Sequence, residues 1–271
     1  MMFNADYVYK ETIDLILKYG KDIATRNGTT KRLTNIVKNF DGTPLVTIRK
    51  TAWRLALREM EWFLSGSSNI NDLHESVRHW WTPWADDKGE IPNNYGKQFR
   101  SFGRHNFDQI NGLLRGIKHH PFSRRNVITL WETGDMAQEE TPITNCHGTM
   151  VQIFGYESYG ETIIDMTMYQ RSGDFALGVQ HNWIQYYALL LWLARETDTK
   201  PGKLTWMGGD IHLYQEHLDV AKKITEIGVP WLQDAPRMMI DSKKGSFMAD
   251  EFIVVDPVPN PVVTDKLVMV V

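Results

Sequence analysis

The chain has 271 residues, of which 42% are hydrophobic, 23% charged and 11% aromatic, and this composition excludes disordered, collagen-like and low-complexity proteins. The 30 basic and 33 acidic side chains give a net charge of −3, which excludes nucleic-acid binding by bulk charge and leaves only local basic pockets for anions. The single cysteine, Cys146, excludes an intramolecular disulfide framework and a cysteine-cluster metal site. Residues 1–10 lack the apolar segment of a signal peptide, and no apolar run approaches the roughly 20 residues of a membrane span, so we expect a cytoplasmic protein.

The spacing of apolar residues in the first part of the chain predicts two helices. Residues 6–19 carry apolar side chains at helical spacing, and a glycine follows them as a stop signal. We expect a polar turn over 26–32 and an extended segment over 33–40. Residues 51–66 predict a second helix, whereas 80–106 is rich in Trp, Asp, Gly, Pro and Asn and predicts mostly loop.

The second part of the chain alternates extended and helical patterns. Residues 126–131 and 163–169 predict strands of a half-buried sheet, and 182–195 and 211–224 predict helices. A proline-containing extended tail follows. The chain is therefore expected to form one α+β domain over residues 1–271, with a mixed or antiparallel sheet and packed helices.

Cys146 is followed directly by His147, a pair that invites comparison with a Cys–His hydrolase. On an extended segment, neighbouring side chains point to opposite faces, so these two are expected to diverge. A lone cysteine is most often a small buried apolar residue. The polar, Gly-flanked segment NCHG instead suits a reactive thiolate close to a cation.

Residues 170–182 form a second polar cluster. Arg171 and Ser172 together suit a phosphate, because Arg offers a bidentate fork and Ser a hydroxyl. Asn182 offers an amide that matches the edge of a pyrimidine base. Further cationic candidates are Arg26, in a Gly/Thr turn, and the pair Arg124 and Arg125, although an Arg pair most often lies on the surface.

Glu59 lies among aromatic residues, and such surroundings raise the pKa of a carboxyl group toward the range useful for proton transfer. The alternative is a solvated glutamate on a helix face. His212 and Tyr214 suit a sugar hydroxyl. His212 and His217 are five residues apart and miss the four-residue spacing of a helical zinc pair, so no metal is expected. A phosphate-binding Walker loop and a GxGxxG motif are absent from the sequence.

Three segments in this order, NCH, QRSGDFALGVQHN and GGDIHLYQEH, resemble the active-site signature of the thymidylate synthase superfamily. The resemblance covers nearly the whole chain and is specific because it extends to many blocks. The further blocks are RNGT at 26–29, PLVT at 44–47, EMEWFLSG at 59–66, WTPWADDKGE at 81–90, YGKQFRSF at 95–102, SRR at 123–125 and the final KLVMVV.

The resemblance implies a pyrimidine deoxynucleotide monophosphate as substrate and 5,10-methylenetetrahydrofolate as carbon donor, without a metal. Cys146 would be the nucleophile that adds to C6 of the base, which divides a difficult substitution at C5 into easier steps. By the same resemblance, Arg171, Arg26 and Ser172 would bind the phosphate, and Arg171 would favour the thiolate. Arg124 and Arg125 would reach the phosphate from a second subunit, so the resemblance implies a homodimer.

The remaining roles also come from the resemblance. His212 and Tyr214 would bind the deoxyribose 3′-hydroxyl, and Glu59 would organise water and move protons in a polar network that includes Tyr95. The residues expected near the folate are Trp81, Asp174 and the C-terminal Val271.

By the resemblance, Asn182 occupies the position whose side chain would bind the base. Its amide can donate to O4 and accept from N3–H of uracil, whereas related enzymes specific for cytosine have Asp there. A flipped amide would suit cytosine, so Asn182 favours dUMP without excluding dCMP.

Two reactions share the same exocyclic methylene intermediate. A thymidylate synthase adds hydride from the folate, whereas a hydroxymethylase lets water attack. Polar residues at Glu61, Asn93, Asn94, Gln180 and His181 depart from the usual thymidylate synthase pattern and could hold water, which favours a dUMP hydroxymethylase that supplies modified phage DNA.

Other features oppose or qualify this interpretation. The tail KLVMVV matches thymidylate synthases and favours a divergent member of that group. Arg49 replaces a usual lysine, and the stretch from Cys146 to Arg171 is longer than the family norm. A third alternative is a catalytically inactive nucleotide- or folate-binding relative, which would not need the thiol. A carbohydrate-binding module is disfavoured because the tryptophans lie in motif blocks or helix cores.

Overall fold

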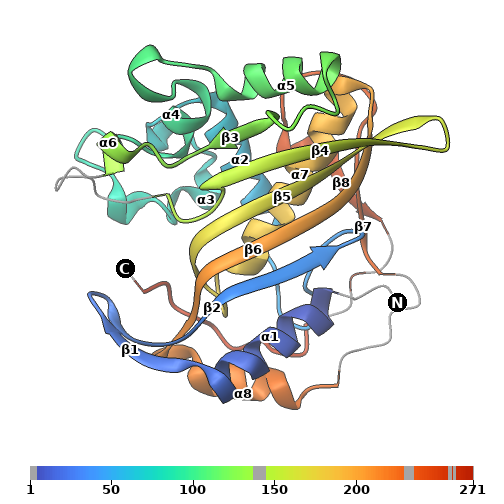
Figure 1. Ribbon diagram of the computed structural model, residues 1–271. Helices are drawn as coiled ribbons and strands as arrows, with labels where there is room; N and C mark the ends of the chain where they lie inside the picture. The colour runs from blue at the N-terminus through green and yellow to red at the C-terminus, as the bar shows by residue number, and fades with distance from the viewer. Residues whose placement is uncertain (1–4, 137–144, 229–234, 256–257, 259–260, 271) are drawn as a thin grey trace.

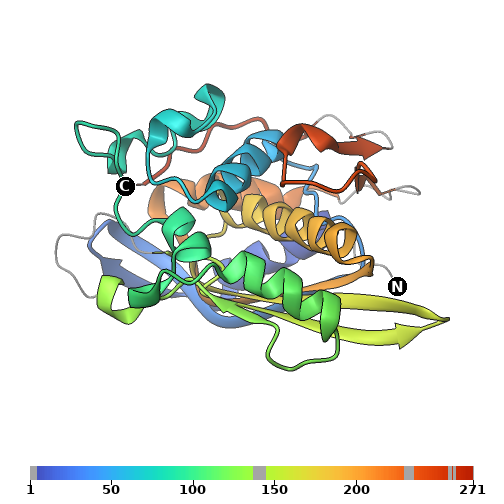
Figure 2. The same ribbon diagram turned by 90° about the horizontal axis from the view of Figure 1, so that it is seen from above.

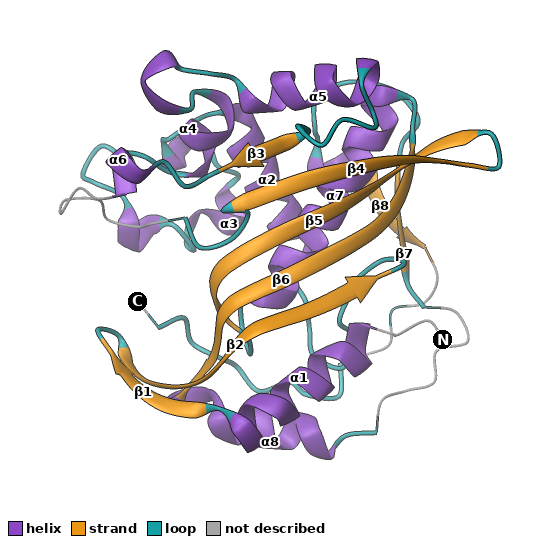
Figure 3. Cartoon of the chain, in the orientation of Figure 1, coloured by secondary structure: helices purple, strands orange, loops and turns teal. Residues whose placement is uncertain are grey.

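The computed structural model describes residues 5–136, 145–228, 235–255, 258 and 261–270. Its centre is a twisted six-stranded sheet with the strand order β1-β2-β6-β5-β4-β3 (Figures 1 and 3). These strands are β1 Lys21–Thr25, β2 Gly28–Phe40, β3 Val127–Thr129, β4 Met150–Ser158, β5 Glu161–Asp174 and β6 Lys200–Tyr214. A separate pair consists of β7 Arg237–Ile240 and β8 Phe252–Val255.

Helices α2 and α7 pack together on one side of the large sheet (Figure 2). The helices are α1 Ala5–Tyr19, α2 Trp53–Ser65, α3 Glu75–Arg78, α4 Tyr95–Arg100, α5 Gln109–His119, α6 Thr133–Met136, α7 Val179–Thr197 and α8 Leu218–Glu226. Short 3-10 turns are η1 Ile70–Asp72, η2 Thr82–Trp84, η3 Gly103–His105, η4 Gln215–His217 and η5 Ala249–Glu251. In the described ranges, no helix is both long and apolar enough to cross a membrane.

Strands β5 and β6 run parallel, and the other neighbours in the large sheet are antiparallel. Helix α7 connects the parallel pair, as a crossover between parallel strands requires. Along β5, the side chains of Ile164, Met166 and Met168 are fully buried and alternate with partly exposed ones. This architecture confirms the expected α+β fold with a mixed sheet and packed helices.

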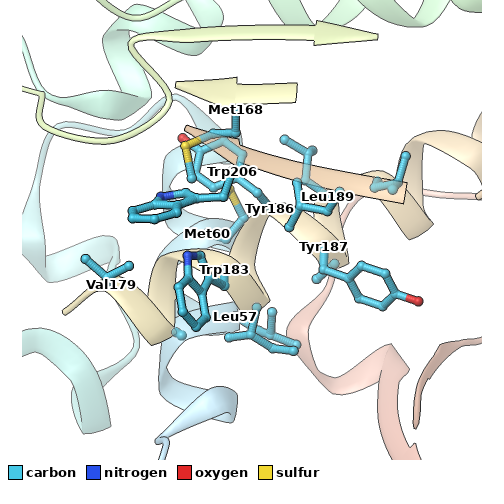
Figure 4. Packing of buried hydrophobic residues seen from close by; sticks show 14 of the residues in the cluster. Leu57, Met60, Met168, Val179, Trp183, Tyr186, Tyr187, Leu189 and Trp206 are labelled. Atoms are coloured by element: carbon cyan, nitrogen blue, oxygen red, sulfur yellow. The ribbon is translucent and has the colours of Figure 1, made fainter. Parts of the chain in front are cut away.

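The core lies between the sheet and the two central helices, and Figure 4 shows part of it. Met168 and Trp206 extend from the sheet, Leu57 and Met60 come from α2, and Trp183 comes from α7. The Trp183 and Trp206 rings meet edge to face, with centroids 5.5 Å apart. This layer holds the inward-facing polar side chains of the two helices at fixed positions.

A kink crosses the three central strands at one level. The register of paired residues is interrupted at three positions, which are Asn35 in β2, Gly209 in β6 and Arg171 in β5. Asn35 has a positive φ of 60°, and a Cβ on Gly209 would lie 2.6 Å from the Tyr169 hydroxyl and 2.8 Å from the Arg171 carbonyl. Glycine is therefore required at 209, and the kink places Arg171 out of the regular alternation of β5.

The helix expected over 211–224 is wrong in its first part. Residues Ile211 and Leu213 extend β6, which pairs with β2 on one side and with β5 on the other. Their spacing of two follows a strand, and the helical stripe of α8 begins only at Leu218. His212 and Tyr214 consequently lie at a strand end and not on a helix.

One loop prediction also needs correction. The polar turn expected over 26–32 is only two residues long, because Thr25 already pairs with Gly28 across the hairpin from β1 to β2. The range 80–106 is mostly loops and short turns, as expected, and its one α-helix, α4, forms after Asn94, whose side chain accepts a hydrogen bond from the backbone N–H of Lys97.

The other three predicted helices and the two predicted strands are confirmed, with shifted ends. The helices over 6–19, 51–66 and 182–195 correspond to α1, α2 and α7, and the strands over 126–131 and 163–169 correspond to β3 and part of β5. The long connection between Cys146 and Arg171 is occupied by the β4–β5 hairpin, which projects from the sheet in Figure 1.

Candidate active site

Cys146 lies in the segment between α6 and β4, beside the kinked part of β5. The backbone N–H of Ser172 donates to the Cys146 carbonyl over 3.3 Å, which joins the two segments. Gly148 has a φ of +60°, and a Cβ there would collide with the Tyr186 hydroxyl. The glycine in NCHG therefore allows the cysteine segment to pack tightly against α7.

The Tyr95 hydroxyl is directed at the cysteine by its other hydrogen bonds. It accepts from the backbone N–H groups of Cys146, over 2.8 Å, and of His147, over 3.3 Å. The same oxygen lies 3.3 Å from Cys146 Sγ. Burial raises the pKa of Tyr95 well above its ordinary value, so the phenol keeps its proton. Because both lone pairs face N–H donors, this proton points to the sulfur.

His147 turns away from the sulfur, as the alternation of an extended segment predicts. Its ring stacks on Tyr95 with centroids 4.3 Å apart, and its Nδ1 lies 3.1 Å from the Tyr186 hydroxyl. Burial lowers the pKa of His147 to about 3, so the ring is neutral near pH 7. This geometry excludes a Cys–His ion pair of the hydrolase type.

Opposing effects set the acidity of the Cys146 thiol. Burial raises its pKa, whereas the Tyr95 hydrogen bond and the Arg171 charge lower it, and the net shift is upward. The Arg171 guanidinium lies 5.1 Å from the centre of the Trp131 ring, and its Nε lies 3.5 Å from the Asn145 carbonyl. An additional cation close to the sulfur would lower the pKa of the thiol further.

Glu59 is buried at the centre of α2, with 8% of its surface exposed. Its Oε1 accepts from Trp81 Nε1 over 2.5 Å, and its Oε2 accepts from Gln185 Nε2 over 2.6 Å. Burial raises its pKa to about 7 despite these two donors. The raised pKa expected from its aromatic surroundings is confirmed, and the solvated alternative is wrong.

A chain of side-chain amides leads from Glu59 to Asn182. Asn182 Nδ2 donates to Gln185 Oε1 over 3.1 Å, and Asn182 Oδ1 accepts from Gln170 Nε2 over 2.9 Å. Gln170 and Gln185 were not among the residues predicted from the sequence to form the site. Gln185 follows Asn182 at the i+3 spacing of one helix face, a signal that could have revealed it.

The polar residues that favoured a hydroxymethylase hold backbone and side-chain partners. Glu61 accepts from the backbone N–H of Ala249 over 2.9 Å, and Asn94 caps α4. Asn93 accepts from Lys97 Nζ.

His181 and Gln180 have partners as well. His181 Nε2 accepts from the Ala52 N–H over 3.1 Å, and its Nδ1 lies 2.9 Å from the Leu177 carbonyl. Gln180 Nε2 donates to that same carbonyl over 2.9 Å. Burial lowers the pKa of His181 to about 4, which agrees with a neutral ring.

The proposed sugar-binding residues lie at the end of β6, opposite the β1–β2 turn. His212 Nδ1 is 3.0 Å from Asp210 Oδ1, and the His212 and Tyr214 rings meet edge to face. The Tyr214 hydroxyl is hydrogen-bonded to the Asn27 side chain, beside the exposed Arg26. The strand pairing thus brings these three predicted residues together.

Arg124 and Arg125 are exposed just before β3. The Arg124 carbonyl accepts from Gln152 Nε2 over 3.3 Å. Neither side chain is shown to join the cluster around Cys146.

Asp174 connects the end of β5 to the C-terminal segment. Its Oδ1 accepts from the backbone N–H of Ala176, and its Oδ2 lies 3.3 Å from His217 Nδ1. His217 Nε2 lies 3.0 Å from the Val268 carbonyl. The terminal Val271, expected to cover the folate, lies outside the described residues.

Among the described residues, no group of three or more His, Cys, Asp or Glu side chains could hold a metal ion. The site contains a thiol, a carboxyl group whose pKa is raised to about 7, side-chain amides and arginines.

Comparison with known proteins identifies the family. The chain matches the family model "Thymidylate synthase" over residues 7–269. The thymidylate synthase of Buchnera aphidicola subsp. Acyrthosiphon pisum (strain 5A) is 32% identical over 269 residues, which cover 96% of this chain and 98% of the relative. The thymidylate synthases of strains APS and Tuc7 are each 31% identical with the same coverage. The chain belongs to the thymidylate synthase family.

Proposed function

We propose that this protein is a thymidylate synthase that converts dUMP and 5,10-methylenetetrahydrofolate to dTMP and dihydrofolate. The observation that carries the proposal is the arrangement around Cys146, where the Tyr95 proton points to Sγ, Arg171 lies close by and Glu59 has a pKa near 7. A binding protein without catalysis would need neither the oriented thiol nor the carboxyl group.

In this proposal, Cys146 Sγ bonds to C6 of uracil, and the electron pair of the C5–C6 bond moves toward O4. Asn182 then stabilises the charge on O4 through an N–H donor. C5 bonds to the folate methylene carbon, and the proton on C5 leaves through the polar network of Glu59 and Tyr95. Loss of the folate nitrogen leaves an exocyclic methylene, hydride from the folate completes the methyl group, and Cys146 departs.

Folate binding is proposed for the apolar and polar groups around Trp81 and Asp174. Arg49 is a further candidate because its Nε is buried and meets no hydrogen-bond partner among the described residues. A carbonyl or carboxylate of the cosubstrate would satisfy this donor. In the sequence, Arg49 is notable only because it replaces a usual lysine of the family.

The exocyclic methylene intermediate also permits attack by water, which is the reaction of a hydroxymethylase. It was favoured because polar residues near the site could hold water. The hydrogen bonds of Glu61, Asn94 and His181 remove the main support for that preference, because each side chain has a structural partner. Curated relatives named thymidylate synthase add further support for methyl transfer.

We also propose a homodimer in which Arg124 and Arg125 bind the phosphate of the neighbouring subunit. Exposed apolar side chains lie on the sheet face opposite α2 and α7, in strands β2 to β4 and β6: they are Val37, Val127, Met150, Phe154, Tyr156 and Met207. Burial of such a face against a second copy would bring the exposed arginines toward another site.

The test is incubation of the purified protein with dUMP and 5,10-methylenetetrahydrofolate. Nucleotide products are identified by mass spectrometry, and dihydrofolate is followed by absorbance. We expect dTMP and dihydrofolate in equal amounts. A 5-hydroxymethyl nucleotide without dihydrofolate would establish the hydroxymethylase, and binding of dUMP without any turnover would support the inactive relative.

A further inference from the structure

The amide chain that holds Asn182 ends at an indole in the core. Trp206 Nε1 lies 2.9 Å from Gln170 Oε1, and both side chains are buried. An indole N–H can only donate, so the oxygen of the Gln170 amide must face it. The Gln170 nitrogen therefore faces the other way, toward Asn182 and toward the Ser172 carbonyl at 3.1 Å.

The direction continues through Asn182. Because Gln170 donates to Oδ1, the Asn182 nitrogen faces Gln185 Oε1. The Gln185 nitrogen then donates to the Ala56 carbonyl over 2.9 Å and to Glu59 Oε2. A carbonyl can only accept, so this end of the chain requires the same direction as Trp206 does.

Asn182 keeps one acceptor position and one N–H donor after these two internal bonds. Such an edge matches O4 and N3–H of uracil. Cytosine presents a donor and an acceptor in the opposite order. A flip of Asn182 alone would set its oxygen against the oxygen of Gln185 and its nitrogen against the nitrogen of Gln170. The fixed direction of the amide chain therefore opposes the flip of the Asn182 amide that binding of cytosine would require.

We propose that Trp206 is a positioning residue that holds one end of the amide chain, as the Ala56 carbonyl holds the other, and thereby favours uracil over cytosine. This inference rests on the proposed function, because it takes Asn182 as the residue that reads the base. Without the Trp206 donor, Gln170 Oε1 would be a buried acceptor with no partner, which weakens the preference of the Gln170 amide for one direction and leaves Asn182 held mainly from the Gln185 end.

The chain contains a matched control for this test. Trp183 lies in the same layer as Trp206 and is equally buried (Figure 4), but its Nε1 meets no hydrogen-bond partner among the described residues. Trp206→Phe and Trp183→Phe remove similar volumes from one core, and only the first removes a hydrogen bond of the amide chain.

The experiment compares the two variants with wild type for dUMP and dCMP, by kcat/KM and by calorimetric binding without folate. We expect the dUMP preference to fall about tenfold or more in W206F and to change less than about twofold in W183F. An equal preference in W206F and W183F would overturn the inference. Binding readouts make this comparison independent of which product forms.

A second variant covers the case in which W206F does not fold. Gln170→Glu preserves the acceptor for Trp206 but presents an oxygen to Asn182 Oδ1, so the dUMP preference should again fall, by about tenfold or more. An unchanged preference in Q170E would also contradict the inference. A wild-type protein that binds neither nucleotide would overturn both the proposed function and this inference, whereas a wild-type preference that persists in the variants overturns the inference alone.

Discussion

The candidate site has two ends: a nucleophile end around Cys146, Tyr95 and Glu59, and an anion end with the exposed Arg26 and Arg124. The two ends differ in how many hydrogen-bond partners the protein itself supplies. At the nucleophile end, Cys146, Tyr95 and Glu59 have internal partners, and the Tyr95 ring stacks on Phe63 and His147. At the anion end, Arg26 and Arg124 are exposed. The groups that would perform chemistry are thus oriented in advance, whereas Arg26 and Arg124, which would bind phosphate, await a ligand.

The difference has an energetic cause. A buried thiol or carboxyl group must have partners, because an unpaired one would cost folding free energy. An exposed guanidinium is hydrated, so the lack of a protein partner costs little folding free energy. The nucleophile end can therefore be organised by folding alone, and the anion end can be organised by binding.

The largest effect on turnover is expected for substitution of Cys146, the proposed nucleophile. Cys146→Ser should lower turnover by at least about 1000-fold, because a hydroxyl is a far weaker nucleophile than a thiolate. Calorimetry should show dUMP binding within a few-fold of wild type, since the anion end is unchanged. Turnover within about tenfold of wild type in C146S would exclude Cys146 as the nucleophile.

Glu59→Gln should lower kcat about 100-fold or more, the usual contribution of a general acid or base. It should also change the pH dependence of stability. Because the folded pKa of Glu59, about 7, lies above its ordinary value of 4.5, the folded state binds this proton more tightly. The stability of wild type relative to E59Q is then highest below pH 4.5 and falls by about 3 kcal/mol as the pH rises toward 7.

Denaturant unfolding of both proteins between pH 4 and pH 8 measures this difference. Other titrating groups cancel in the comparison because both proteins contain them. Parallel stability curves for wild type and E59Q would show that Glu59 titrates normally and would contradict the burial argument.

At the anion end, Arg26→Ala should raise the KM for dUMP about 10- to 100-fold, which corresponds to one charge-assisted hydrogen bond. Its free energy of unfolding should stay within about 0.5 kcal/mol of wild type, because the side chain is exposed. Lys21→Ala is the control, since Lys21 is an exposed cation of the same hairpin. Equal KM values in the two variants would remove Arg26 from the phosphate site.

The smallest effect on the reaction is expected for His181→Phe. The product should be unchanged, and stability should fall by about 1–3 kcal/mol because the Ala52 N–H loses its acceptor. Product analysis and thermal unfolding together check this expectation. A shift in product identity would restore the argument that His181 controls water in the site.

The sequence allowed much of the fold to be predicted, because the apolar spacing of α1, α2 and α7 follows a helix and the segment within β5 alternates. It failed at residues 211–214, where the alternation of Ile211 and Leu213 is too short to be distinguished from the start of the helix that follows. Pairing with β2 and β5, which are far away in the sequence, makes these residues a continuation of β6.

The site shows the same limit. Glu59 and Cys146 could be identified because their types and surroundings carry chemistry. The roles of Gln170 and Gln185 depend on which way an amide faces, and this depends on Trp206 and Ala56, which are far away in the sequence. The hydrogen bond of His181 to the Ala52 N–H could not be predicted for the same reason, since a backbone partner cannot be read from a residue type.

Hydride tracing tests the central claim most directly. The protein would be given dUMP and 5,10-methylenetetrahydrofolate that carries deuterium at the hydride-donating carbon, in water labelled with heavy oxygen. The account predicts dTMP with deuterium in its methyl group and no heavy oxygen from water. A product with heavy oxygen in a 5-hydroxymethyl group and no deuterium would contradict it.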